Sequence, residues 1–103
     1  AWSVGDKANQ MEHKIPFFNG LGAVLVSVNY RLTVAGNGVQ HPDHVEDVAA
    51  ALAWVREHAV ELGGAPNRLT LLGHSAGAHL VALAVTNPRF LASRGLTAAD
   101  VAC

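Results

Sequence analysis

The stretch LTLLGHSAG, residues 69–77, decides the fold class expected of this chain. Its first four residues predict a short apolar strand, and the apolar run over residues 76–85 predicts a buried helix. Between them lies a G-x-S-x-G pattern with its serine at Ser75. A sharp turn from a strand into a helix forces such a serine into a strained backbone conformation and lifts its hydroxyl clear of the strand.

The residues around Ser75 favour nucleophilic chemistry. A helix that begins at Ala76 directs its free N–H groups and the positive end of its dipole at a reacting carbonyl oxygen, which makes the Ala76 N–H a candidate oxyanion donor. We expect that only glycine fits at Gly73 and Gly77, because a side chain there would collide with the neighbouring strand or helix. His74 contacts the neighbouring strand or loop or, alternatively, the substrate. A glycine-rich turn with a capping serine is the competing interpretation of the motif.

Upstream of this motif the sequence predicts a second strand and a long helix. AVLVSV, residues 23–28, is almost continuously apolar and typical of a strand buried on both faces. From Asp43 to about Leu62, apolar residues recur every three or four positions and predict an amphipathic helix, which Gly63 and Gly64 terminate. The order strand, helix, strand, helix indicates an α/β fold built on a parallel sheet.

The rest of the N-terminal half predicts less regular structure. Residues 29–40 are polar, contain glycine and indicate a loop. Residues 7–21 are expected to be helical in part, with Met11 and Phe18 inward, and to be broken or kinked at Pro16. Trp54 falls beside the apolar stripe of the long helix and is expected in the core.

The composition is that of a folded globular chain. Half of the 103 residues are hydrophobic, 15% are charged and the net charge is −1, which excludes a disordered chain. The sequence has no surplus of Lys and Arg, so its charge does not point to a nucleic acid or a membrane surface as partner. The longest apolar stretch, residues 48–55, is far shorter than the about 20 residues that a membrane span needs. No signal peptide is visible, which predicts a cytoplasmic location, and a single cysteine builds no disulfide framework.

The chain resembles the α/β-hydrolase family over nearly its whole length. It is similar to arylformamidase-like (kynurenine formamidase-like) and hormone-sensitive-lipase-like carboxylesterases. Four segments carry the resemblance: VNYRL at 28–32, the helix and loop over 46–69, GHSAGAH at 73–79, and AWSVGDK at 1–7, which looks like the sequence after a His-Gly-Gly oxyanion motif. The resemblance implies a three-layer αβα fold with a parallel sheet, of which two strands and the flanking helices lie in this chain.

The resemblance also implies that residues 1–103 are the central, nucleophile-elbow fragment of a single hydrolase domain. Oxyanion-loop glycines would precede the chain, and the acid and histidine of the catalytic triad would follow the serine. Only Asp100 among the acidic residues lies downstream of Ser75, and no histidine follows His79, so the triad is incomplete in this sequence. We expect the 103 residues alone to be inactive and poorly folded, because the strand between the two visible ones would be missing.

The function that the resemblance implies is that of a serine hydrolase. A small-molecule ester or amide would form an acyl-enzyme on Ser75, and this chemistry needs no cofactor. Lipase-like members continue Tyr-Arg-Leu with Ala-Pro-Glu, whereas Thr33-Val34-Ala35 follow here, which favours short acyl esters or N-formyl aryl amides. A lipase-like enzyme for longer acyl chains and a non-catalytic hydrolase-like module are the alternatives. The oligomeric state is not indicated.

Further candidates have ordinary structural interpretations beside functional ones. His79, four residues after Ser75, is expected to pack beside its helix rather than reach the hydroxyl. His41 and His44, with acidic residues nearby, have residue types that could bind a metal ion. Because they lie at the start of a helix, we interpret them as cap and dipole residues and expect no metal site. Trp2, near the implied oxyanion loop, is a candidate for lining the substrate pocket, with simple packing as the alternative.

Overall fold

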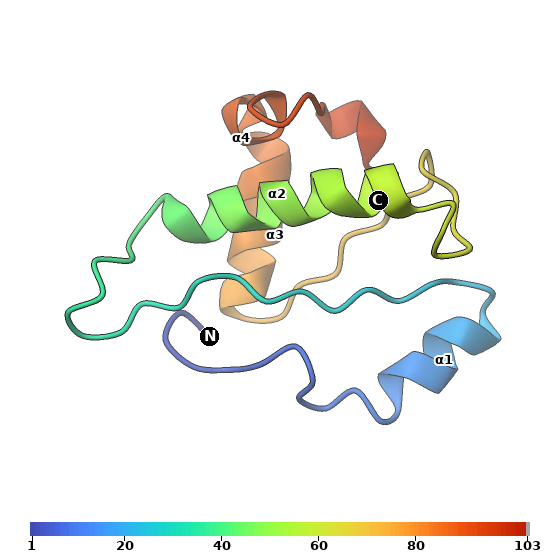
Figure 1. The fold of residues 1–103 in the computed structure, drawn as a ribbon, viewed down its shortest axis with the longest axis horizontal. Helices are drawn as coiled ribbons and strands as arrows, with labels where there is room; N and C mark the ends of the chain where they lie inside the picture. Colours follow the sequence, from blue (N-terminus) through green and yellow to red (C-terminus); the bar gives the residue numbers. More distant parts are fainter. Residues whose placement is uncertain (103) are drawn as a thin grey trace.

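The computed structural model describes residues 1–102, and helices are the regular elements within them. In Figure 1 the helix over residues 43–58 crosses the helix over residues 76–86 steeply, and an extended segment of the N-terminal half runs beneath the former. None of the helices in this part of the chain has the length and apolarity to cross a bilayer. The elements are α1 (Lys14–Gly20), α2 (Asp43–His58), α3 (Ala76–Thr86), α4 (Pro88–Ala92) and the short 3-10 helix η1 (Ala98–Asp100).

The α/β class with two strands, expected from the sequence, is wrong for this structure. Residues 23–28 and 69–72 run as extended chain, but neither forms a strand anywhere in residues 1–102. The pairing found there is an isolated parallel bridge between Leu69 and Val101, with the Ala102 N–H donating to the Leu69 carbonyl at 2.7 Å. A strand requires a continuous ladder of hydrogen bonds with a neighbour, and these two extended segments do not supply it to each other.

The burial expected of residues 23–28 is also corrected. Val24, Val26 and Val28 are exposed, whereas Leu25 and Ser27 between them are half-buried. Successive side chains of an extended chain point to opposite sides, so one row of this segment is more deeply buried than the other. A continuous apolar run therefore does not by itself mean burial on both faces.

Helix α2 forms where the periodicity predicts it. It begins at Asp43, and the carboxylates of Asp43 and Glu46 lie in its first turn, where the helix dipole favours negative charge. It ends at His58, four residues before the predicted end, and the chain leaves through a turn in which the Gly64 N–H donates to the Ala59 carbonyl at 2.7 Å. Gly63 in that turn has a φ of +84°, which glycine adopts without strain.

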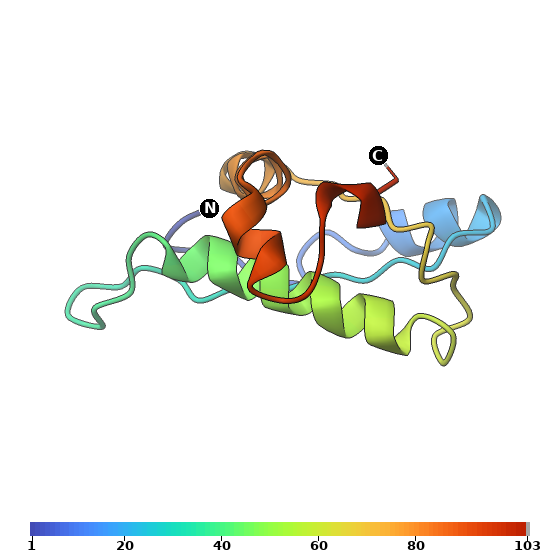
Figure 2. The same ribbon diagram turned by 90° about the horizontal axis from the view of Figure 1, so that it is seen from above.

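The apolar core lies where α2, α3 and α4 meet. Figure 2 shows α4 beside both longer helices. Helix α3 buries one side only, so the expectation of a helix buried all round is wrong for this structure; Ala78 and Ala82 are exposed. Helix α4 was not anticipated, although the Asn87 side chain caps it by accepting from the Arg89 N–H at 3.3 Å. Most of the buried hydrophobic residues form two clusters, Val45, Ala49, Leu80, Ala84 and Phe90 in one and Leu52, Leu91 and Leu96 in the other.

Two local expectations about aromatic and proline residues are also corrected. Trp54 is 50% exposed and stacks on His58 one turn later, with 4.2 Å between ring centroids, so it lies outside the core. Pro16 does not break a helix, because α1 begins only at Lys14 and places Pro16 in its first turn. There the missing N–H has no intrahelical acceptor to lose.

Candidate active site

Ser75 occupies a sharp turn at the start of α3. Its backbone has φ +55° and ψ −122°, a left-handed conformation that costs a non-glycine residue about 1–3 kcal/mol. The residue is exposed, and its hydroxyl makes no capping hydrogen bond to the helix. The interpretation of Ser75 as a capping residue requires that bond, so the geometry leaves the hydroxyl available for another role.

The two glycines that flank Ser75 differ in what they allow. A Cβ on Gly73 would come within 2.6 Å of the Gly77 carbonyl carbon and oxygen and 2.7 Å of the Ala78 Cα, so only glycine fits. A Cβ on Gly77 would meet nothing within 4 Å in the described chain, so the collision predicted there is not found. The turn is closed by the Gly77 N–H, which donates to the His74 carbonyl at 2.9 Å.

Ala76 is the first residue of α3 and is buried. The N–H groups of a first helical turn have no acceptor within the helix, and they carry the positive end of its dipole. The helical ladder begins at the preceding residue, because the Ser75 carbonyl accepts from the His79 N–H at 3.2 Å. The Ala76 N–H is therefore adjacent to the exposed serine and suited to bind a developing negative charge.

A groove of about 370 Å³ lies beside the first half of α3, where His79 and Leu80 line it. Trp2 forms part of its wall and meets two imidazoles edge-on, that of His79 at a centroid distance of 5.3 Å and that of His44 at 5.5 Å. The structure therefore brings Trp2 to α3, the helix that follows the candidate nucleophile. The side chain of His79 packs against Trp2 beside this helix, as expected. The groove is lined by Trp2, Thr33, Gln40, His41, His44, His79 and Leu80.

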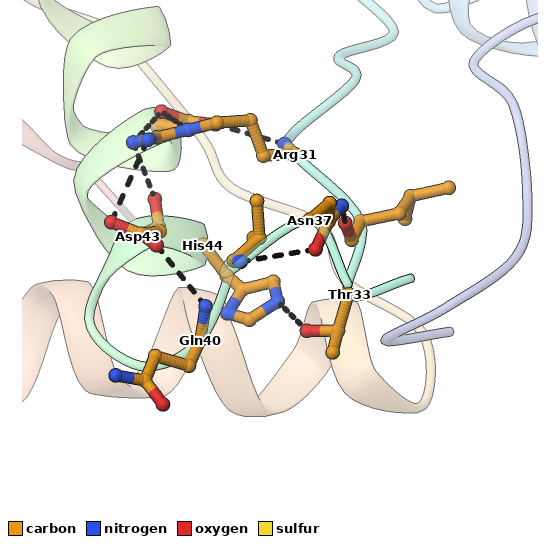
Figure 3. A network of polar contacts seen from close by, with 9 residues as sticks. Arg31, Thr33, Asn37, Gln40, Asp43 and His44 are labelled. Carbon is orange, nitrogen blue, oxygen red and sulfur yellow. Dashed lines mark hydrogen bonds and ion pairs between the residues drawn. The ribbon is translucent and has the colours of Figure 1, made fainter. Parts of the chain in front are cut away.

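His44 has a different role from the one its position suggested. It is 5% exposed, and its Nε2 lies 2.8 Å from the Thr33 hydroxyl, as Figure 3 shows. Sequence reasoning treated it as a helix-start residue, but its ring faces inward beside Trp2 and Tyr30. The burial of His44 could have been predicted from its spacing from Val48, because residues four apart lie on the same face of a helix.

The loop before α2 is organised by side-chain hydrogen bonds (Figure 3). The Asn37 amide donates to the Leu32 carbonyl at 2.9 Å, and its oxygen accepts from the Val39 N–H at 3.0 Å. The Gln40 N–H donates to the Asp43 carboxylate at 3.1 Å. These bonds join the end of the extended segment to the start of α2 and so hold the rim of the groove.

Arg31 anchors the same segment to α2. Its Nε and Nη2 donate to the Asp47 carboxylate at 2.9 and 2.8 Å, and its backbone N–H donates to the same carboxylate at 2.8 Å. The hydrogen bonds from the Arg31 side chain hold the pKa of Asp47 below its usual value. Asp43 adds a longer ion pair to the Arg31 guanidinium at 3.5 Å.

The N-terminal segment lies along the extended segment and is tied to it at several points. The Tyr30 hydroxyl donates to the Ala1 carbonyl at 2.8 Å, and the Thr33 N–H donates to the Trp2 carbonyl at 2.9 Å. Further along, the Lys7 N–H donates to the Asn29 side chain at 2.7 Å. These contacts place Trp2 at the groove although it belongs to no helix.

Asp100, the acidic residue downstream of Ser75, is engaged elsewhere. Its carboxylate accepts from the Thr97 N–H at 2.8 Å and pairs with the Arg56 guanidinium at 2.9 Å. The hydrogen bond from the Thr97 backbone, with Arg56 nearby, lowers the pKa of Asp100. Asp100 therefore closes a capping box on η1 and links it to α2.

Comparison with known proteins identifies the family of the chain. The model of the BD-FAE family matches residues 1–92. The chain belongs to the BD-FAE family. This membership confirms the resemblance to α/β-hydrolase esterases drawn from the motifs, although the described part of this BD-FAE member is helical.

Curated relatives of this BD-FAE member are named as esterases. The chain is 40% identical to the probable carboxylic ester hydrolase LipM and 38% identical to the esterase LipQ, both of Mycobacterium tuberculosis, with matches covering 85% and 99% of the chain. It is 33% identical to the fumonisin B1 esterase of Sphingopyxis macrogoltabida, over 84% of the chain. The matches cover 20%, 24% and 19% of these relatives, so the chain spans no more than about a quarter of their length. No solved structure shows significant similarity.

Proposed function

We propose that the protein is a serine hydrolase that cleaves carboxylic esters or small amides through an acyl-enzyme on Ser75. The observation that carries this proposal is the left-handed backbone of Ser75, with its hydroxyl exposed and free of a capping bond, directly before the buried start of α3. Strain of this kind persists where function requires it. The family membership supports carboxylic ester hydrolysis as the reaction class.

The proposed reaction at Ser75 has two steps. A base removes the hydroxyl proton as the serine oxygen attacks the substrate carbonyl, and the alcohol or amine leaves with a proton; water then releases the acid and restores the hydroxyl. The Ala76 N–H stabilises the oxyanion of each tetrahedral intermediate. We assign neither the base nor its orienting acid to the described residues, because His79 packs against Trp2 and Asp100 is held by η1 and α2.

The proposed substrates are short acyl esters or N-formyl aryl amides. The Thr33-Val34-Ala35 sequence supports this preference over a lipase-like one, and Trp2 offers an aromatic wall for a small group in the groove. Assays of the natural protein on p-nitrophenyl acetate, a long-chain p-nitrophenyl ester and N-formylkynurenine test it. Faster turnover of the long-chain ester would favour the lipase-like alternative.

Labelling tests the nucleophile directly. In the natural protein, a fluorophosphonate probe is expected to modify Ser75, and Ser75→Ala is expected to abolish labelling and to lower turnover by about 10⁴-fold or more while the protein stays folded. Ser3→Ala, which removes another exposed hydroxyl, is the matched control and should retain both. Labelling at another residue, or turnover unchanged by Ser75→Ala, would contradict the assignment. A folded natural protein with neither labelling nor turnover would favour the non-catalytic module.

A further inference from the structure

Thr33 connects the N-terminal segment to helix α2 through two separate hydrogen bonds. Its backbone N–H donates to the Trp2 carbonyl at 2.9 Å, and its hydroxyl lies 2.8 Å from the Nε2 of His44 (Figure 3). His44 is 5% exposed and belongs to the first turn of α2, so its backbone is fixed by the helix. The hydrogen bond to Thr33 then fixes which way the imidazole faces.

The His44 ring in turn meets the indole of Trp2. Their centroids lie 5.5 Å apart at an interplanar angle of 78°, the edge-to-face arrangement that aromatic rings prefer. The same indole also contacts the imidazole of His79, with 5.3 Å between ring centroids and an interplanar angle of 71°. Trp2 therefore sits between a ring of α2 and a ring of the nucleophile helix, both of which line the groove.

Trp2 depends on these contacts for its position. It lies in no helix and is 42% exposed, so neither a backbone ladder nor deep burial orients the side chain. The hydrogen bond from Thr33 restrains its backbone, which leaves the indole free to rotate unless a neighbouring ring blocks it. The buried ring of His44 is the neighbour whose own orientation is set by a hydrogen bond.

We propose that His44, oriented by Thr33, is a positioning residue that fixes Trp2 as the wall of the groove and so sets how well a substrate binds there. The inference rests on the proposed function, because it assigns the groove to the substrate of the Ser75 reaction. His44 acts through the indole and does not touch the reacting atoms. Its effect therefore falls on substrate binding rather than on the chemical step.

A double-mutant cycle on the natural protein tests this coupling, with p-nitrophenyl butyrate as substrate. His44→Ala is expected to raise KM roughly three- to tenfold and to leave kcat within about threefold, a change in the range that aromatic pair contacts supply. In a Trp2→Ala background the same substitution is expected to change KM by less than about twofold, because the residue it acts through is gone. An equal rise of KM in both backgrounds would overturn the proposal, since a purely structural role of His44 is additive.

Two further variants separate the ring of His44 from its hydrogen bond. His44→Phe keeps an aromatic ring against Trp2 and is expected to hold KM within about threefold of the natural protein. His44→Gln keeps a group that can bond Thr33 but removes the ring, and is expected to behave as His44→Ala does. The reverse order, with rescue by glutamine alone, would overturn the proposal. Failure of the proposed function itself is distinguishable, because the unsubstituted protein would then show neither turnover nor fluorophosphonate labelling of Ser75.

Discussion

The side chain and the backbone N–H of Arg31 bind one and the same carboxylate, that of Asp47 on α2. The guanidinium makes a two-pronged contact at 2.9 and 2.8 Å, and the N–H adds a third hydrogen bond at 2.8 Å. Paired contacts of this geometry are the strong form of the arginine–carboxylate interaction. The extended segment and the long helix are therefore fixed to each other directly upstream of Thr33 and the groove.

Asp47→Asn is expected to destabilise the natural protein by about 1–2 kcal/mol. This is less than a fully buried charge-assisted hydrogen bond would contribute, because the Arg31 side chain is 50% exposed. The loss is measured as the change in free energy of unfolding in urea. Glu57→Gln removes an exposed charge from the same helix and is the matched control, for which a change within about 0.5 kcal/mol is expected. Equal effects of the two substitutions would show that the ion pair contributes nothing.

The same pair predicts how stability depends on pH. The folded protein lowers the pKa of Asp47, so the ionised carboxylate binds more favourably in the folded state than in the unfolded one. Its contribution is fully present above the unfolded pKa of about 3.9 and is lost as pH falls toward the lower folded value. Asp47→Asn should therefore flatten the fall in unfolding free energy between about pH 5 and pH 3. An unchanged slope would contradict the attribution to this residue.

Gly73→Ala is expected to be far more damaging than Gly77→Ala. A Cβ at Gly73 meets the backbone of Gly77 at 2.6 Å, which no side-chain rotation relieves, so the turn must open and Ser75 must move. We expect a loss of at least about 2 kcal/mol in unfolding free energy and loss of fluorophosphonate labelling. At Gly77 the Cβ meets no described atom, and alanine favours the helix, so stability should hold or rise by up to about 1 kcal/mol. Equal damage by both substitutions would contradict this local explanation.

Ser75→Gly is expected to be more stable than Ser75→Ala, although both are inactive. Alanine keeps the Cβ that makes φ +55° unfavourable, whereas glycine adopts this conformation freely. Part of that gain is offset by the larger entropy of glycine in the unfolded chain, which leaves a difference of about 1 kcal/mol. Thermal unfolding of the two variants in the natural protein measures it. A less stable glycine variant would show that the turn stores no strain.

Asp100→Asn is expected to leave turnover of the natural protein within about threefold. Its carboxylate caps η1 and pairs with Arg56, so its removal weakens the link between η1 and α2 without touching the serine. Arg56→Gln removes the other partner of the pair and should have a similarly small effect on turnover. A loss of about 10³-fold or more on Asp100→Asn alone would identify this residue as the orienting acid of the nucleophile.

Elements that depend on local pattern were predicted well from the sequence. The start of α2 could be predicted because its apolar periodicity and the acidic residues of its first turn coincide near Asp43. The G-x-S-x-G pattern around Ser75 indicated a tight turn, and the structure gives Ser75 a positive φ there. Both features are settled by residues within one or two helical turns, so a single sequence contains the information.

Features that depend on distant partners were predicted poorly. Residues 23–28 and 69–72 have the composition of strands, but strand formation requires a partner that composition does not supply. The burial of His44 was missed for a related reason, since it depends on Thr33 and Trp2, which are remote in the sequence. Phe90 and Leu91 gave too short a signal to reveal α4, a helix of five residues held by its contacts with α2 and α3.

The three consecutive residues Asn29, Tyr30 and Arg31 each bind a different part of the molecule. Asn29 holds the backbone of Lys7, Tyr30 holds that of Ala1, and Arg31 holds helix α2. Adjacent side chains of an extended chain point in opposite directions, so adding or removing one residue here would turn each side chain away from its partner. Over evolutionary time, an insertion or deletion at this tripeptide would therefore disconnect three contacts in a single event.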